Sequence, residues 1–181
     1  MKSSKEPHFG RDLKQGQQDE RRFWEISEQF YLEGSGLRLI QMDGRGRDFR
    51  VIERDSKSVL AEEYAELKTD RYTFQETKNF FIEIYSNQAL KTPGGPTQAL
   101  EHNNAWFIYR FKYEGDIFVF KTGELVEFLE ANDKIYRKAS VYNPMGSYSS
   151  LGYVVPRYGI IRDIYRHMIG PADKKETNEK Q

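Results

Sequence analysis

The order of helix-forming and strand-forming segments is the feature that most constrains the fold of this chain. Apolar residues recur at helical spacing from Arg11 to Leu32, and Gly34 ends that pattern. The expected strands then cover residues 48–52, 59–68, 80–85, 106–111 and 117–120, and the further expected helices cover residues 97–103, 122–129 and 159–168. Helices placed between groups of strands predict an α/β fold, with a central mixed β-sheet flanked by helices.

Several of these segments carry more specific signals. Phe80–Tyr85 is almost continuously apolar, which predicts a strand buried on both faces. Glu114-Gly115 is placed to close a hairpin, and Thr122 is placed to cap the helix that follows it. Beyond Asp133 the chain is rich in Tyr, Ser, Gly and Pro without clear periodicity, until Gly159–Met168 predicts an amphipathic terminal helix.

Length and composition exclude several classes of protein. A chain of 181 residues forms about one domain with its own core. It has no cysteine, which excludes disulfides, thiolate zinc sites and a cysteine nucleophile. The first residues lack the apolar core of a signal peptide, and no apolar run is long enough to span a membrane. We therefore expect a soluble, cytoplasmic protein with no membrane partner, a flexible leader over 1–9 and a disordered tail over 171–181.

A possible metal site lies in the first expected hairpin. A turn centred on Lys57 pairs residues whose numbers sum to 114, which places Asp48 opposite Glu66, although a bulge would shift this register by one. Lys68 shares a face with Glu66 because side chains two apart on a strand point the same way. Two carboxylates suit Mg²⁺, the Leu67 carbonyl could be a third ligand, and the ammonium could act on a phosphodiester. Alternatively, these are ordinary charges on the wet face of a hairpin.

Two further acids extend this hypothesis. Glu20 precedes Phe23 and Trp24 by three and four residues, so it lies on the apolar stripe of the first helix. A carboxylate there needs a cation or a metal ion, unless it flanks the stripe and reaches solvent. Glu83 is either a further metal ligand or a single acid at the edge of an apolar strand.

The order of these motifs resembles the PD-(D/E)XK phosphodiesterase superfamily, in particular its small phage-encoded and resolvase-like members. The resemblance covers about residues 10–130. The similar segments are the opening helix with its acid (16–20), the strand at Asp48, Ala65–Asp70, Asn79–Asn87, Pro93–Gly95 and the hairpin of 106–120. Arg47 stands where the superfamily motif is written with a proline before the Asp, a departure that its members often show.

The resemblance implies a restriction-endonuclease-like core over residues 10–132 and cleavage of DNA with Mg²⁺, or with Mn²⁺ as a substitute. By position, Asp48 and Glu66 become metal ligands, Lys68 the catalytic lysine and Glu20 the carboxylate of the helix. We expect a homodimer, because cutting both strands of a duplex needs two active sites. An association with a phage or mobile element is also expected, which would place the protein in the cytoplasm of a host cell.

A basic, Tyr-rich extension is expected over residues 133–170. Residues 134–168 contain six Lys or Arg and one acid, Asp163, with tyrosines between the cations. Cations contact phosphates, and tyrosines stack on bases. The candidate nucleic-acid contacts are Arg137, Lys138, Tyr153, Arg157 and Gln98, which follows the Pro93–Pro96 loop and could instead be an ordinary polar residue at the start of a helix. The extension could instead be a flap that packs on the sheet or on a second subunit.

These observations together predict an enzyme. The expected activity is a Mg²⁺-dependent DNA endonuclease that uses direct attack by water, because no Ser, Cys or Tyr nucleophile with a neighbouring base is evident. One alternative is a catalytically inactive nuclease fold that binds nucleic acid or serves in assembly. Another is a phosphodiesterase with a different specificity, such as RNA.

Overall fold

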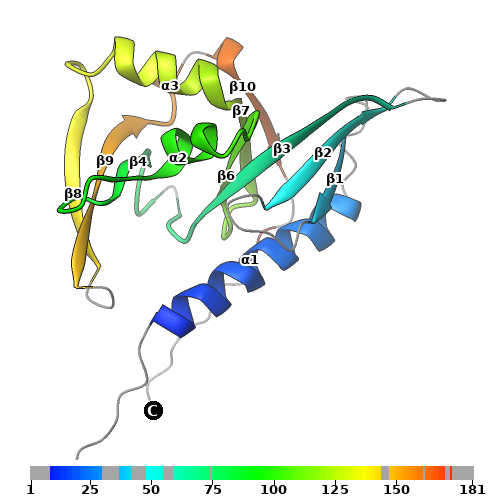
Figure 1. Ribbon diagram of the computed structural model, residues 1–181, viewed down its shortest axis with the longest axis horizontal. Helices are drawn as coiled ribbons and strands as arrows, with labels where there is room; N and C mark the ends of the chain where they lie inside the picture. The colour runs from blue at the N-terminus through cyan, green and yellow to red at the C-terminus, as the bar shows by residue number, and fades with distance from the viewer. Residues whose placement is uncertain are drawn as a thin grey trace, which may run out of the picture.

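The computed structural model describes residues 9–29, 37–41, 48–54, 59–73, 75–143, 147–160, 162–169 and 172. These residues form an α/β fold with two β-sheets and flanking helices (Figure 1). The helices are α1 (Phe9–Gln29), α2 (Gly95–Glu101) and α3 (Thr122–Ala131), with a 3₁₀ turn, η1, at Arg162–Ile164. None of the described helices has the length and apolar character needed to cross a membrane.

A six-stranded mixed sheet, sheet A, forms the centre of the molecule. Its strands are β1 (Leu37–Gln41), β2 (Phe49–Arg54), β3 (Val59–Asp70), β6 (Trp106–Phe111), β7 (Asp116–Lys121) and β10 (Tyr165–Ile169), in the order β1-β2-β3-β6-β7-β10. Only β3 and β6 pair in parallel among these neighbours. The central mixed sheet expected from the sequence is therefore present.

A second, antiparallel sheet, sheet B, lies beside the first. It contains β4 (Asn79–Asn87), β5 (Thr92–Pro93), β8 (Arg137–Asn143) and β9 (Tyr148–Pro156), in the order β5-β4-β9-β8. Figure 1 shows α1 on one side of sheet A, while α2 and α3 lie on the other side with sheet B. Both faces of the central sheet are thus covered.

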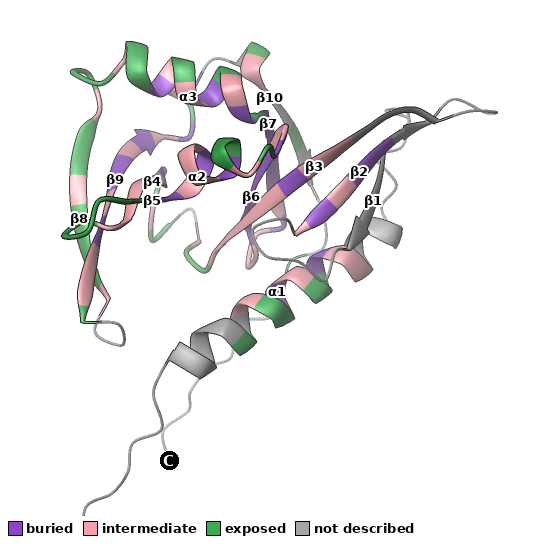
Figure 2. Cartoon of the chain, in the orientation of Figure 1, coloured by how far each residue is buried: buried purple, intermediate pink, exposed green. Residues whose placement is uncertain are grey.

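Each face of sheet A has its own apolar core. On the face covered by α1, Phe23 of the helix packs with Phe49 and Val51 of β2 and with Ile108 of β6. The opposite core joins sheet A to sheet B, α2 and α3, all of which carry buried residues (Figure 2). Most of its buried residues are aromatic. Its fully buried residues include Phe80, Phe107, Phe111, Phe120, Leu125 and Val155. Burial on both sides explains why β6 and β7 read as nearly continuous apolar runs.

The expectation that Phe80–Tyr85 forms a strand buried on both faces is wrong. Only Phe80 and Ile82 of β4 are buried, and the intervening residues are partly exposed. One face of β4 packs on the aromatic core, whereas the face that carries Phe81 and Glu83 borders a cleft. The hairpin expected at Glu114-Gly115 is confirmed by the antiparallel pairing of β6 with β7.

The C-terminal third departs most from the expectation. The helix expected over Gly159–Met168 is wrong, because this segment contains η1 and the edge strand β10. The rings of Tyr165 and His167 lie against Phe118, with centroids 5.4 Å and 4.6 Å away, so they follow the period of a strand and cover one face of β7. Strands β8 and β9, where no regular structure was expected, complete sheet B.

Smaller differences concern the ends of elements. The first helix begins at Phe9, inside the expected leader, while its expected end at residues 30–32 lies outside the described residues. The helix expected over 97–103 runs instead from Gly95 to Glu101. Thr122 is the first helical residue of α3 and does not cap it, because Lys121 occupies the cap position without a side-chain hydrogen bond. Apart from residues 9 and 172, the expected leader and tail lie outside the described residues.

We expect Gly152→Ala to destabilise sheet B. A Cβ at Gly152 of β9 would lie 2.8 Å from the Ile82 carbonyl oxygen and 2.8 Å from carbons of the Phe81 ring. Overpacking of this kind lowers the free energy of unfolding by about 2 kcal/mol, which urea denaturation would measure. Gly123→Ala is the matched control, because nothing lies within 4 Å of the added carbon. Equal stability of the two variants would contradict this close packing.

Candidate active site

The pairing of β2 with β3 confirms the register expected from the sequence. Paired residue numbers sum to 114 from Phe49–Ala65 to Glu53–Ala61, and the register shifts only at Arg54, next to the turn. The turn itself, residues 55–58, lies outside the described residues. The shift occurs at the far end of the hairpin, so it leaves Asp48, which immediately precedes β2, beside the part of β3 that carries Glu66.

A hydrogen bond fixes Asp48 against β3. The Leu67 amide donates to Asp48 Oδ2 at 2.7 Å, and the Asp48 amide donates to the Ala65 carbonyl oxygen at 3.2 Å. The amide and carbonyl of one strand residue leave the strand on the same side. The Leu67 carbonyl therefore lies on the side of β3 where Asp48 is held, as expected for a third ligand.

Glu20 reaches the same region from α1. Phe23, one helical turn later, packs edge to face on Phe49 with ring centroids 5.4 Å apart, so α1 crosses the sheet where β2 begins. Burial raises the pKa of Glu20 to about 7, with further contributions from the nearby charges of Asp48 and Asp19. The structure thus brings the helix carboxyl and the strand carboxyls close enough to interact.

The pKa values of the two carboxyls of the hairpin are raised as well, that of Glu66 the most. Burial raises the pKa of Asp48 to about 6, although the hydrogen bond from Leu67 opposes the rise. Burial also raises the pKa of Glu66 to about 8, with additional contributions from the charges of Asp48 and Glu20, and Lys68 lowers it. Glu66 Oε2 is buried and has no hydrogen-bond partner among the described residues. Three carboxyls from three elements therefore repel one another in a partly dry site.

Lys68 lies on the same face of β3 as Glu66 and points toward sheet B. Its Nζ is 3.6 Å from Glu83 Oε1 on β4. Glu83 is held in turn by α2, because the backbone of Gly95 (φ +50°) approaches so closely that a Cβ there would lie 2.9 Å from the Glu83 carbonyl oxygen. Glu83 therefore positions the lysine, an interaction that the sequence reading did not anticipate for it.

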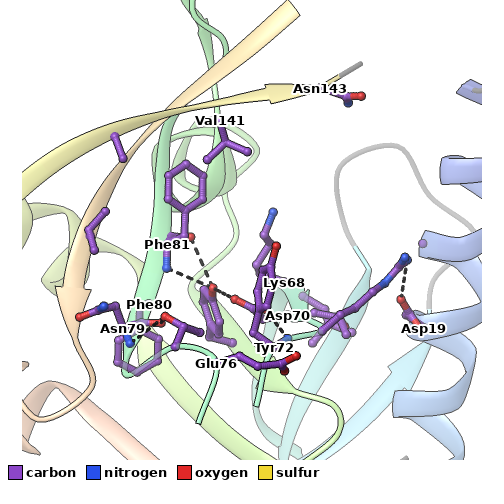
Figure 3. Close-up of a pocket in the computed structure, with 18 of the residues that line it drawn as sticks. Asp19, Lys68, Asp70, Tyr72, Glu76, Asn79, Phe80, Phe81, Val141 and Asn143 are labelled. Atoms are coloured by element: carbon purple, nitrogen blue, oxygen red, sulfur yellow. Dashed lines mark hydrogen bonds and ion pairs between the residues drawn. The ribbon is translucent and has the colours of Figure 1, made fainter. Parts of the chain in front are cut away.

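A cleft of about 920 Å³ opens beside these groups, between α1, the end of β3 and sheet B (Figure 3). Glu20, Leu67 and Lys68 all line it. The cleft also contains Asp70, whose Oδ2 accepts a hydrogen bond from the buried Tyr109 hydroxyl at 2.7 Å. Burial raises the pKa of Tyr109 well above its ordinary value, so this hydroxyl stays protonated and donates to Asp70.

An ion-pair cluster anchors α1 at the mouth of the cleft. Lys112 Nζ lies 2.9 Å from Asp19 Oδ1, and Arg71 lies 3.5 Å from the other oxygen of the same carboxylate. Asp19 precedes Glu20 directly, so the cluster also fixes the helix carboxyl of the site. No pattern in the sequence indicates this role for Lys112, because it lies in the turn after β6, far along the chain from the helix.

The expected nucleic-acid contacts divide into two groups. Arg157 is buried and paired with Glu114 at 2.7 Å, and Tyr153 is buried with its hydroxyl donating to Asp133 at 2.6 Å. Neither side chain is placed to touch a nucleic acid, so these two expectations are wrong. Lys138 is exposed but pairs with Asp133.

Two contact residues remain open. Arg137, at the start of β8, is exposed and lines the cleft. Gln98 lies in α2, where it is partly buried. Its backbone amide donates to the Gly94 carbonyl oxygen at 3.4 Å. Arg137 is therefore the contact residue that the arrangement supports best, because it shares a cleft with Lys68.

The donor chemistry of the site suits a hard divalent cation. Among the described residues, no three His, Asp or Glu side chains meet at the separations that hold a metal ion. Mg²⁺ does not need such a cage, because it usually takes one or two carboxylates and keeps several waters. Asp48, Glu66 with its buried oxygen atom lacking a hydrogen bond, and the Leu67 carbonyl offer only oxygen donors. These residues therefore fit Mg²⁺ and do not fit a softer metal.

Comparison with known proteins assigns no family to this chain. No protein-family model matches it, and neither a curated protein nor a solved structure matches it. The resemblance to the PD-(D/E)XK superfamily therefore depends on the motifs in the sequence.

Proposed function

We propose that the protein is a Mg²⁺-dependent DNA endonuclease with a PD-(D/E)XK active site in a restriction-endonuclease-like core. The observation that carries this proposal is the hydrogen bond from the Leu67 amide to Asp48. It holds one carboxyl beside the segment that presents a second carboxyl, on Glu66, and the ammonium of Lys68. Glu20 adds a third carboxyl from the helix. A chance scatter of charges on a hairpin would not place these groups in a partly buried site.

Each residue has a role in hydrolysis by direct attack of water. Asp48, Glu66 and the Leu67 carbonyl would hold the metal ion, which when bound lowers the pKa of a coordinated water and polarises the phosphoryl oxygen. Lys68 orients the attacking water or stabilises the charge that builds on the phosphate. Its pairing with Glu83 aims the ammonium across the cleft. The carboxylate of Glu20 accepts a hydrogen bond or a proton from the water on the helix side.

The proposal extends to assembly and origin. The described part of one chain contains one such site, so cleavage of both strands of a duplex requires two copies, and we propose a homodimer. The motif order that supports the superfamily assignment is that of phage-encoded members, and a phage or mobile element is the proposed source. The described residues give no position for the partner copy.

Cleavage assays test the proposal directly. We expect Mg²⁺ or Mn²⁺ to permit cleavage of closed circular DNA, single-stranded or duplex, and EDTA to abolish it, because Asp48 and Glu66 are oxygen donors for a hard cation. Gel electrophoresis of circular and linear DNA measures the products, and conversion of closed circles identifies an endonuclease. Cleavage that persists in EDTA, or closed circles that remain intact while linear DNA is degraded, would contradict the proposal.

A further inference from the structure

One face of sheet B forms an apolar wall of the cleft. Phe81 of β4 pairs with Val154 of β9, and Val154 pairs with Arg137 of β8, so these three side chains form one row across the sheet. All three line the cleft, as does Val141 further along β8. Gly152 carries no side chain, and the Phe81 ring lies over it. The middle of this wall is therefore apolar, with Arg137 and Asn143 of β8 lining the cleft beside it and Glu83 of β4 on the same face of the sheet.

The apolar groups remain accessible although they line a hollow. Val141 is 48% exposed, and Tyr72, on the opposite wall after β3, is 59% exposed. Figure 3 shows both side chains in the cleft, with Lys68 between the two walls. A monomeric protein seldom keeps apolar side chains accessible within one hollow unless they contact a ligand.

The charges of the cleft do not form a track for a duplex backbone. Two of its cations already interact with carboxylates, because Lys68 pairs with Glu83 and Arg71 pairs with Asp19. Acids such as Glu76 line the cleft as well. Proteins that bind a duplex through its phosphates need several cations along the backbone, and this cleft is lined by acids as well as by cations.

An apolar wall contacts bases, whereas phosphates need cations and donors. In a duplex the bases are stacked inside, where a wall in a cleft cannot reach them unless they are unpaired or flipped out. We propose that this cleft binds unpaired nucleotides of a DNA substrate, with bases against Phe81, Val141 and Tyr72, and leads the strand to Lys68. This inference rests on the proposed function and specifies its substrate as single-stranded DNA or the single-stranded part of a branched molecule.

Binding without cleavage tests the inference separately from the nuclease. A fluorescent deoxythymidine oligomer of about 15 nucleotides, the matching duplex, and a duplex with a single-stranded tail are titrated with the full chain in EDTA. We expect the oligomer and the tailed duplex to bind at least about tenfold more tightly than the blunt duplex. The affinity should depend only weakly on salt, because few phosphate contacts form.

Two adjacent residues of β8 provide a matched pair of variants. Val141→Glu places a charge inside the cleft, while Tyr142→Glu places it on the other face of the same exposed strand. We expect the first to weaken binding of the oligomer by at least about tenfold and the second to leave it unchanged. Tyr72→Ala should also weaken binding, since stacking on an aromatic ring contributes to affinity for each base. Circular dichroism confirms that each variant is folded.

The outcomes separate the two proposals. Equal or tighter binding of the blunt duplex, absence of binding, or equal effects of Val141→Glu and Tyr142→Glu would overturn the inference about the cleft. Mg²⁺-dependent cleavage could still occur in each of those cases. Tight binding of the oligomer without cleavage in any divalent cation would leave the cleft as a single-strand site and overturn the nuclease.

Discussion

Lys68→Ala is expected to reduce metal-dependent cleavage of DNA by about 10³-fold, because a positioned ammonium that orients water or stabilises phosphate charge contributes on this scale. The variant should fold normally, since Lys68 is partly exposed and its ion pair with Glu83 is long, at 3.6 Å. Initial rates of cleavage measure the effect, and DNA affinity is measured in parallel. The affinity for DNA should change little, because the variant removes one cation of the cleft and leaves Arg71 and Arg137 in place.

Two further variants make this test specific. Lys121→Ala is the control, because Lys121 is exposed and pairs only locally with Glu124 on α3. Glu83→Gln keeps Lys68 but removes the charge that positions it, so a smaller loss of about tenfold is expected, without loss of Mg²⁺ dependence. Unchanged cleavage in Lys68→Ala would exclude the lysine from the chemistry, whereas no cleavage by the original protein would favour a catalytically inactive fold.

The stability of the metal-free protein is expected to fall as the pH rises from about 4.5 to about 8. The pKa values of Asp48, Glu20 and Glu66 are raised to about 6, 7 and 8 in the folded protein, so the folded state binds their protons more tightly than the unfolded chain does. Below the ordinary pKa of these groups both states are protonated and the groups have no effect. As the pH rises, the folded protein must ionise crowded, buried carboxyls, and the free energy of unfolding decreases.

Glu66→Gln tests this pH dependence. In EDTA at about pH 8.5 the variant should be more stable than the original protein by about 2 kcal/mol, because it removes the most strongly raised carboxyl from a site that solvent partly screens. At pH 4 the two proteins should be equally stable. Mg²⁺ should stabilise the original protein and affect the variant less, because one ligand is lost. Thermal denaturation over this pH range, with and without Mg²⁺, measures both effects.

A different result would change the interpretation of the site. Stability that rises with pH between 5 and 8 would mean that the three carboxyls are paired in the folded protein. Glu124→Gln on the exposed surface of α3 provides the control for a simple loss of charge. It should alter stability equally little at both pH values, because exposed charges contribute weakly.

The local pattern of the sequence determined the first hairpin and the metal-site candidates. The turn centred on Lys57 predicted the register of this hairpin, and that register places Phe49 and Val51 in the core beneath α1. The spacing of Glu66 and Lys68 then places both on one face, and the helical period places Glu20 on the stripe that meets the sheet. These predictions depended on neighbours along the chain or across one turn.

The structural features that could not be predicted depend on contacts between residues that are far apart in the sequence. Arg157 appeared to be a free cation, yet it is buried over the Phe111 ring at 3.3 Å and paired with Glu114, which no local pattern indicates. The segment around Tyr165 has apolar residues at a spacing compatible with a helix, but the open edge of β7 selects a strand. The fold class was therefore predictable, while the second sheet and the cleft were not.

The pairing of β4 with β9 also affects how the protein forms during synthesis. Phe80 is paired with Val155, so β4 leaves the ribosome long before its neighbour in the sheet exists. Contacts of such high sequence separation slow folding and leave apolar surface open to aggregation. Sheet B is complete only after β9 has been synthesised, and the central sheet only after β10 has followed it. A nascent chain that has not yet reached β9 would therefore lack the wall of the cleft that sheet B provides.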